Sequence, residues 1–168
     1  PVFAMKSVMV HDTVLSARQV QRQDKVMIGG NFVRWYGGYD SYLAAQETGF
    51  SIWLPSMGRK QKGEELIPFL NHMPYMDWTQ WVHRLAECKI GIHLMPTLAA
   101  GSFAMNCGFL GIPCIGYRGI DTQSIIHPEL TVDLGDLSKA KALAARLVND
   151  LAFYERCSQQ ALENYTRY

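Results

Sequence analysis

The stretch IGIHLMPTLAAGSFAMNCGFLGIPCIG, residues 90–116, holds a strand, a loop, a helix and a second strand in succession. Its opening residues, 90–95, form a short apolar run typical of a buried strand, and 114–116 begin another after the GIP turn. Residues 102–110 have the apolar content of a packed helix. A strand, helix and strand in this order predict a βαβ unit and therefore a parallel sheet.

The same alternation continues on both sides of this segment. We expect further strands at 25–29, 50–54, 67–71 and 130–134, and further helices at 35–48, 77–88, 138–149 and 151–165. The pattern predicts an α/β fold, a Rossmann-like parallel sheet with helices on both faces. Residues 25–168 would form this nucleotide-binding domain with its C-terminal helices. Residues 1–24 would be a leading segment or interdomain linker, in which 2–10 are compatible with a strand and 11–24 with a polar helix.

Composition and charge exclude several classes of protein. With 168 residues, 48% of them hydrophobic, the chain is large enough for one packed domain and too short for two large ones. Sixteen basic and fifteen acidic residues give a net charge of +1 without a basic block, which disfavours nucleic acid as a partner. No apolar run approaches the roughly 18 residues of a membrane span. We therefore expect a cytoplasmic protein with no membrane span.

The cysteines and histidines do not suggest metal or disulfide chemistry. The four cysteines are scattered without the spacing of a zinc site, which favours small buried side chains in a reducing compartment. The five histidines are equally dispersed, so no metal site is predicted. The chain begins with Pro1 rather than methionine, which suggests a piece of a longer chain.

The start of the helix at 102 is the strongest candidate for a phosphate site. In an open parallel sheet, ligands bind at the carboxyl ends of the strands, where the loop before Gly101 and Ser102 must lie. The first turn of a helix presents free N–H groups and the positive end of the helix dipole, which suit a diphosphate. Asn106 lies one turn further on the same face and could reach a ribose or sugar hydroxyl, although an ordinary structural asparagine is an equal alternative.

A second candidate loop follows the first strand. The sequence GGNFVR places Gly29 and Gly30 where a phosphate or sugar could approach the backbone, with Asn31 beside them and Arg34 able to add positive charge. A simple tight turn is the competing interpretation of the two glycines.

Residues 90–116, with the flanking HMPYMDWTQWVHRLAECK, resemble the C-terminal, donor-binding half of GT-B fold glycosyltransferases of the group 1, or family 4, type. That family carries two glutamates separated by seven residues before a small-Gly-x-Pro turn, and the second glutamate binds the donor ribose. Alignment on Gly111 and Pro113 places Leu98 and Asn106 at these positions, so this chain lacks the two-glutamate motif.

The resemblance also implies roles for residues outside the helix start. Arg34 and the loop residues Arg59 and Lys60 would neutralise the leaving diphosphate, so that no metal or other cofactor is needed. A solvated surface loop is the alternative for 59–62. Met73, Tyr75 and Met76, before the helix at 77, are the candidates for contact with the nucleotide base, and of these we expect Tyr75 to make it. Trp78 and Trp81 have the spacing of packing residues.

Together these features predict a donor-binding domain for a UDP-sugar or GDP-sugar, acting in carbohydrate biosynthesis as part of a hexosyltransferase. No catalytic triad, carboxylate pair or activated cysteine is evident, so the catalytic residues are unassigned. We expect the isolated chain to be inactive without an N-terminal GT-B domain as partner. A GT-B fold sugar-nucleotide epimerase and a non-catalytic flavodoxin-like nucleotide-binding module are the alternatives.

Overall fold

The computed structural model describes residues 9–56 and 61–168, apart from the side chain of Arg34. The six strands are β1 (Gln23–Ile28), β2 (Ser51–Leu54), β3 (Leu70–His72), β4 (Cys88–His93), β5 (Cys114–Tyr117) and β6 (Thr131–Val132). The α-helices are α1 (Gly38–Ala45), α2 (Trp78–Ala86), α3 (Ser102–Leu110), α4 (Asp121–Ile126), α5 (Leu137–Asn149) and α6 (Leu151–Arg167). Shorter 3-10 turns are η1 (His11–Gln19), η2 (Arg34–Tyr36), η3 (Gln46–Thr48), η4 (Glu64–Leu66) and η5 (Pro128–Leu130).

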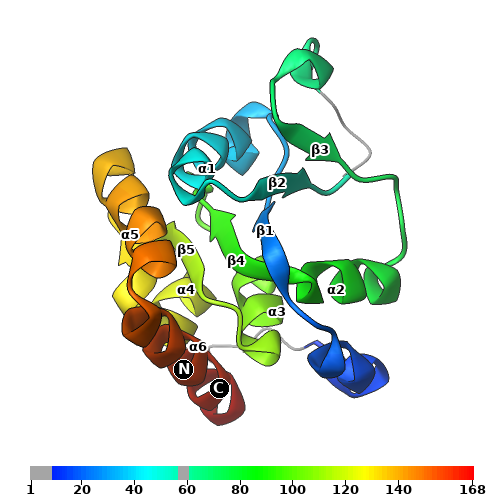
Figure 1. The fold of residues 1–168 in the computed structure, drawn as a ribbon, viewed down its shortest axis with the longest axis vertical. Helices are drawn as coiled ribbons and strands as arrows, with labels where there is room; N and C mark the ends of the chain where they lie inside the picture. Colours follow the sequence, from blue (N-terminus) through cyan, green and yellow to red (C-terminus); the bar gives the residue numbers. More distant parts are fainter. Residues whose placement is uncertain (1–8, 57–60) are drawn as a thin grey trace, which may run out of the picture.

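The strands form one parallel sheet in the order β3-β2-β1-β4-β5-β6. The chain first builds outward from β1 to β3, then returns to the other side of β1 and continues from β4 to β6 (Figure 1). This reversal opens a crevice between the carboxyl ends of β1 and β4, the position at which such sheets bind ligands. The predicted Rossmann-like α/β fold is confirmed.

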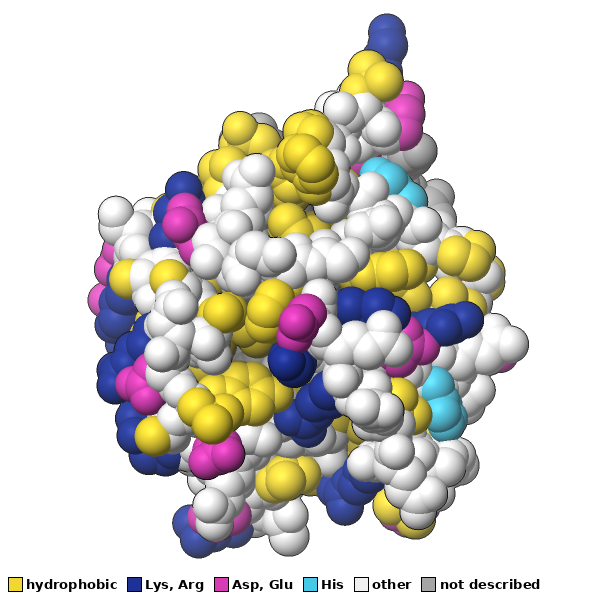
Figure 2. All heavy atoms as spheres, in the orientation of Figure 1, with side chains coloured by type: hydrophobic (Ala, Val, Ile, Leu, Met, Phe, Trp, Pro, Cys, Tyr) yellow, Lys and Arg dark blue, Asp and Glu magenta, His cyan; other side chains and the backbone are white. Residues whose placement is uncertain are grey.

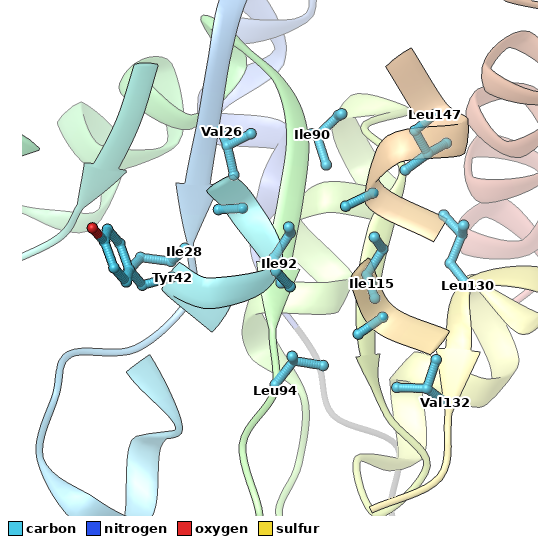
Figure 3. Packing of buried hydrophobic residues seen from close by; sticks show 14 of the residues in the cluster. Val26, Ile28, Tyr42, Ile90, Ile92, Leu94, Ile115, Leu130, Val132 and Leu147 are labelled. Atoms are coloured by element: carbon cyan, nitrogen blue, oxygen red, sulfur yellow. The ribbon is translucent and has the colours of Figure 1, made fainter. Parts of the chain in front are cut away.

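Helices cover both faces of the sheet because its strand residues are apolar on both sides. Val26 and Ile28 of β1 point toward α1, α5 and the start of α6, in the cluster drawn in Figure 3. Met27, between them, points to the opposite face, where it joins a second cluster built from η1, α2 and α3. Alternate side chains of one strand therefore hold both layers of helices in place.

Several element boundaries differ from the sequence-based expectation. The expected helix 35–48 is divided, because Gly37 has a φ of 64° and separates η2 from α1. The expected strand 67–71 is only Leu70–His72, since Pro68 has no N–H to pair and Phe69 has a φ of 61°. The expected strand 130–134 shortens to Thr131–Val132, between the turn η5 and Gly135. The strand expected at 90–95 is β4, which begins and ends two residues earlier than expected.

The leading segment packs against the domain from its ninth residue onward. Val14 and Ala17 of η1 are buried in the cluster shared with α2 and α3. The Arg18 guanidinium donates to the carbonyl of Phe109 at 2.9 Å, which attaches η1 to α3. The expectation of a strand at 2–10 falls almost entirely outside the described residues, and the role of residues 1–24 as an interdomain linker stays a prediction.

We expect Gly37→Ala to destabilise the protein by about 3 kcal/mol or more, because two effects combine there. Gly37 has a positive φ, and an added Cβ would overlap the carbonyl oxygen of Leu94 at the end of β4. Gly49→Ala is the matched control, since its φ is also positive, at +66°, but nothing lies within 4 Å of an added Cβ. The control should lose only about 1–2 kcal/mol. If urea unfolding showed equal losses of unfolding free energy for the two variants, the steric overlap at Gly37 would be contradicted.

Candidate functional site

A cleft of about 290 Å³ lies at the carboxyl edge of the sheet. Its walls come from the segments that follow β1, β2 and β3 and from the first two turns of α3. The residues that line it are Met9, Gly29, Pro55, Ser56, Pro74, Met76, Trp78, Trp81, Ser102, Phe103 and Asn106. The cleft therefore occupies the crevice that the reversal between β1 and β4 opens.

The start of α3 forms the polar end of the cleft. Ser102 is the first residue of the helix and is exposed, whereas Phe103 and the rest of α3 are buried. The Gly101 N–H donates to Asp121 Oδ1 at 3.4 Å, and the Ser102 N–H donates to the Ala100 carbonyl at 3.2 Å. The N–H groups of Phe103 and Ala104, which follow in the first turn, have no partner inside a helix and are the donors available beside the Ser102 hydroxyl.

Gly101 is held rigidly behind the helix start. The hydroxyl of buried Thr122 donates to the Gly101 carbonyl at 2.7 Å. An added Cβ at Gly101 would overlap Thr122 and Ile120, so packing of the chain against itself already requires glycine there. The Asp121 carboxylate accepts from the Thr122 N–H at 2.6 Å and stabilises the same loop. These contacts fix the direction of α3 relative to the cleft.

The GGNF loop contributes Gly29 to the cleft wall, while its neighbours have packing roles. An added Cβ at Gly29 would meet the rings of His93 and Phe103, and one at Gly30 would meet the backbone of Tyr36. Asn31 is buried, and its side-chain oxygen accepts from the Val33 N–H at 3.1 Å. The structure brings only Gly29 of this loop into contact with the cleft.

The other predicted site residues fall into two groups. Tyr75 is 79% exposed and lines a neighbouring hollow with Thr79 and His83 of α2 instead of the cleft. Arg34 lies in η2, but its side chain is not among the described atoms. Arg59 and Lys60 lie outside the described residues. The basic residues expected at the site are therefore still predictions.

The apolar wall includes residues that sequence reasoning assigned to packing. Trp78 and Trp81 line the cleft and also contact the core cluster of α2 and α3. Met76 lines the cleft where Tyr75 was expected. Helical spacing predicts packing for both tryptophans and cannot show that the helix is the wall of a crevice. The order of the strands places α2 beside the crevice, and knowledge of that order would have identified both tryptophans as lining residues.

Asn106 is the most constrained polar residue of the cleft. It is 2% exposed, and its Oδ1 accepts a hydrogen bond from His11 Nε2 at 2.8 Å. The other ring nitrogen of His11 lies 2.6 Å from the Tyr165 hydroxyl. Burial lowers the pKa of His11, so the ring is neutral near pH 7. Sequence reasoning found Asn106 but missed His11, which lies 95 residues away in the chain.

His93 lies beneath the cleft at the end of β4. Its ring packs edge-on against Phe103 at 5.4 Å between centroids. Both ring nitrogens are buried and have no hydrogen-bond partner among the described residues. Burial lowers the pKa of His93 to about 4, so it is neutral near pH 7. The buried ring beside Gly29 and Phe103 therefore adds no positive charge next to the cleft near pH 7.

The cysteines offer no activated nucleophile. All four are buried. Burial raises the pKa of the Cys88 thiol to about 12 and that of Cys157 to about 11. A reactive cysteine needs a lowered pKa and access to solvent; Cys88 and Cys157 have neither, and burial denies solvent access to Cys107 and Cys114 as well. Within residues 9–56 and 61–168, no three His, Cys, Asp or Glu side chains group as metal ligands would.

Solved structures resemble this chain over most of its length. The C-terminal domain of a glycosyl transferase group 1 family protein (LpcC) from Francisella tularensis matches with a TM-score of 0.68 and 11% identity, over 96% of this chain and 94% of that domain. The chain has the GT-B C-terminal fold. The chain also matches HepE from Anabaena, solved in complex with UDP-glucose, with a TM-score of 0.71 and 11% identity.

WaaG, a glycosyltransferase involved in lipopolysaccharide biosynthesis, matches this chain with a TM-score of 0.71 and 9% identity. The match covers 86% of this chain for HepE and 95% for WaaG, but only 44% and 48% of those chains. The chain therefore spans less than half the length of either protein. No protein-family model and no curated protein sequence matches it.

The surface charge and the apolar content of the helices bear on nucleic-acid and membrane partners. On the face shown in Figure 2, Lys and Arg side chains are interspersed with Asp and Glu and form no single basic field. In the described ranges, none of the helices combines the length and apolar content needed to cross a bilayer.

Proposed function

We propose that this chain is the donor-binding half of a glycosyltransferase and that the cleft at the start of α3 binds a nucleoside-diphosphate sugar. The observation that carries the proposal is the exposed start of α3, with Ser102 lining the cleft at the crevice between β1 and β4. A helix start in this position provides N–H donors and a positive dipole for a diphosphate. The HepE complex with UDP-glucose supports the choice of ligand class.

The polar and apolar parts of the cleft suit different parts of such a ligand. The diphosphate would lie at Gly101 and Ser102, with Gly29 opposite and Asn106 one helical turn further in. Met76, Trp78 and Trp81 provide an apolar wall that suits the flat base. Arg34, Arg59 and Lys60 remain proposed sources of positive charge, while Gly30 and Asn31 would shape the loop and Tyr75 would contact the base from the neighbouring hollow.

In this proposal the chain stabilises the leaving group. Cleavage of the bond between sugar and phosphate leaves negative charge on the nucleoside diphosphate, and fixed dipoles aimed at that charge lower the barrier. The acceptor and any general base would come from an N-terminal domain, because none of the described residues that line the cleft is a carboxylate or a histidine. Hexosyl transfer by the complete protein and a cytoplasmic location belong to the same proposal.

Titration of the chain with nucleotides tests the ligand class. We expect isothermal calorimetry to show saturable binding of one of UDP, GDP and ADP, and no comparable binding of FMN or NAD. Binding should persist in EDTA, because the helix start and not a metal ion neutralises the phosphates. FMN or NAD binding without any nucleoside-diphosphate binding would support a flavodoxin-like module and reject the proposal. Product analysis with the full-length protein separates a transferase from an epimerase.

A further inference from the structure

The residues that contact Asn106 determine which end of its amide faces the cleft. Oδ1 faces His11 Nε2 at 2.8 Å, and an oxygen can only accept, so Nε2 must carry the proton. In a neutral ring Nδ1 is then an acceptor, and the Tyr165 hydroxyl, 2.6 Å away, donates to it. The three side chains form a relay of two hydrogen bonds that runs from the Tyr165 hydroxyl through His11 to Asn106 Oδ1.

Packing holds the relay in this arrangement. The His11 ring is 3% exposed and stacks on Phe109, with 4.3 Å between centroids and 11° between planes. Tyr165 of α6 packs edge-on against both His11 and Phe109. Because the ring cannot turn without breaking these contacts, Nε2 stays aimed at Asn106.

The Nδ2 group, at the other side of the Asn106 amide, is left to interact with a ligand. Asn106 lines the cleft, and its Nδ2 group has no hydrogen-bond partner among the described residues. Because Oδ1 is committed to His11, the group that Asn106 offers to a ligand is an N–H donor. An acidic side chain at this position would instead offer an acceptor. The polarity of this part of the cleft is therefore decided by His11, from outside it.

We propose that His11 is a positioning residue that turns the Asn106 amide so that Nδ2 donates to an acceptor oxygen of the bound nucleotide. This inference rests on the proposed function, and the oxygen belongs to a ribose hydroxyl or to a phosphate. It makes η1, at the beginning of the chain, a part of the binding site.

UDP titrations of the Asn106→Asp and Asn106→Leu variants test whether the side chain at position 106 donates to the nucleotide or accepts from it. Asp keeps an acceptor toward His11 but replaces the Nδ2 donor by a carboxylate oxygen. We expect UDP affinity to fall about threefold to tenfold in Asn106→Leu and more than tenfold in Asn106→Asp. Affinity equal to or above that of the wild type in Asn106→Asp would overturn the proposal, because the amide would then act as an acceptor.

The role of His11 is tested by His11→Phe, which keeps the stacked ring and removes both nitrogens. We expect a loss of UDP affinity similar to that of Asn106→Leu and no further loss when the two are combined. His83→Phe is the matched control, because His83 also joins η1 to α2, through Ser16 at 3.0 Å, but lies outside the cleft. Fully additive losses would show that His11 does not act through Asn106.

Two further measurements identify the oxygen and separate the proposal from the proposed function. With 2′,3′-dideoxy-UDP, the effect of Asn106→Leu should disappear if a ribose hydroxyl is the acceptor and persist if a phosphate is. Both results support a donor at Asn106. Nitrogen-15 NMR of the ligand-free protein should show His11 protonated at Nε2. A ring protonated only at Nδ1 would overturn the relay even if the protein bound no UDP, whereas failure to bind UDP alone would reject only the proposed function.

Discussion

Ser102→Asp is expected to weaken UDP binding by roughly a hundredfold while leaving the fold intact. Ser102 is exposed at the first position of α3 and lines the cleft, so a carboxylate there would lie beside the proposed diphosphate. A like charge about 5 Å from a phosphate costs about 3 kcal/mol at an effective dielectric constant of about 20, which corresponds to roughly two orders of magnitude in affinity.

The same substitution should not harm the helix. An acidic residue in the first turn interacts favourably with the helix dipole, so we expect the melting temperature to be unchanged or slightly raised. Ser102→Asn is the matched control, with similar size and no charge, and it should bind UDP within a few fold of the wild type. Because the penalty is electrostatic, it should shrink as salt is added. Equal UDP affinity in Ser102→Asp and Ser102→Asn would remove the start of α3 from the phosphate site.

Lowering the pH from 6.5 toward 4 is expected to destabilise the protein through two buried histidines. Burial lowers the pKa of His93 and of His127 to about 4, against an ordinary value of 6.5. Below pH 6.5 the unfolded chain binds protons at these sites that the folded chain does not, so the free energy of unfolding falls with the pH. Each histidine should contribute a loss of roughly 3 kcal/mol by pH 4, and above pH 6.5 neither should have an effect.

Variants assign this acid sensitivity to the two residues. His93→Leu removes a ring without a described hydrogen-bond partner, and His127→Gln keeps a group able to donate to the Ala104 carbonyl, which His127 Nε2 contacts at 3.0 Å. Each should reduce the slope of unfolding free energy against pH between 6.5 and 4. Ile92→Val, beside His93 on β4, should lower stability at every pH without altering the slope. Unchanged slopes in both histidine variants would contradict the assignment.

The predictable part of the molecule consists of features encoded within short stretches of chain. The apolar runs of β1, β2 and β5 and the helical pattern of α5 and α6 follow from local periodicity, and their predicted bounds agree with the structure to within two residues. Asp77 accepts from the Gln80 N–H at 2.9 Å, as its position before α2 predicts. The predicted bounds of the short strands beside Pro68 and Gly135 were less accurate, because one unusual backbone angle can end a strand.

Some residues of the candidate site were indicated by local sequence patterns, whereas others are revealed only by the fold. Gly29, Ser102 and Asn106 line the cleft, and local patterns pointed to them because each lies at the end of a predicted strand or on the predicted helix beyond it. Their role in binding stays a prediction. Trp78 and Trp81 were assigned to packing, since helical spacing looks the same whether a side chain faces a core or a crevice. Tyr75 and Met76 are adjacent in sequence, and only the path of the chain decides that Met76 lines the cleft.

By itself, the sequence determined the α/β class, the parallel sheet and the exposed start of α3, because apolar periodicity and turn residues act over a few neighbours. The tertiary structure alone decided the strand order and hence where the crevice opens. It also decided that His11 meets Asn106 and Tyr165, residues separated from it by 95 and 154 positions. No local pattern encodes such a relay, since its hydrogen bonds exist only after η1, α3 and α6 have packed around a shared aromatic core.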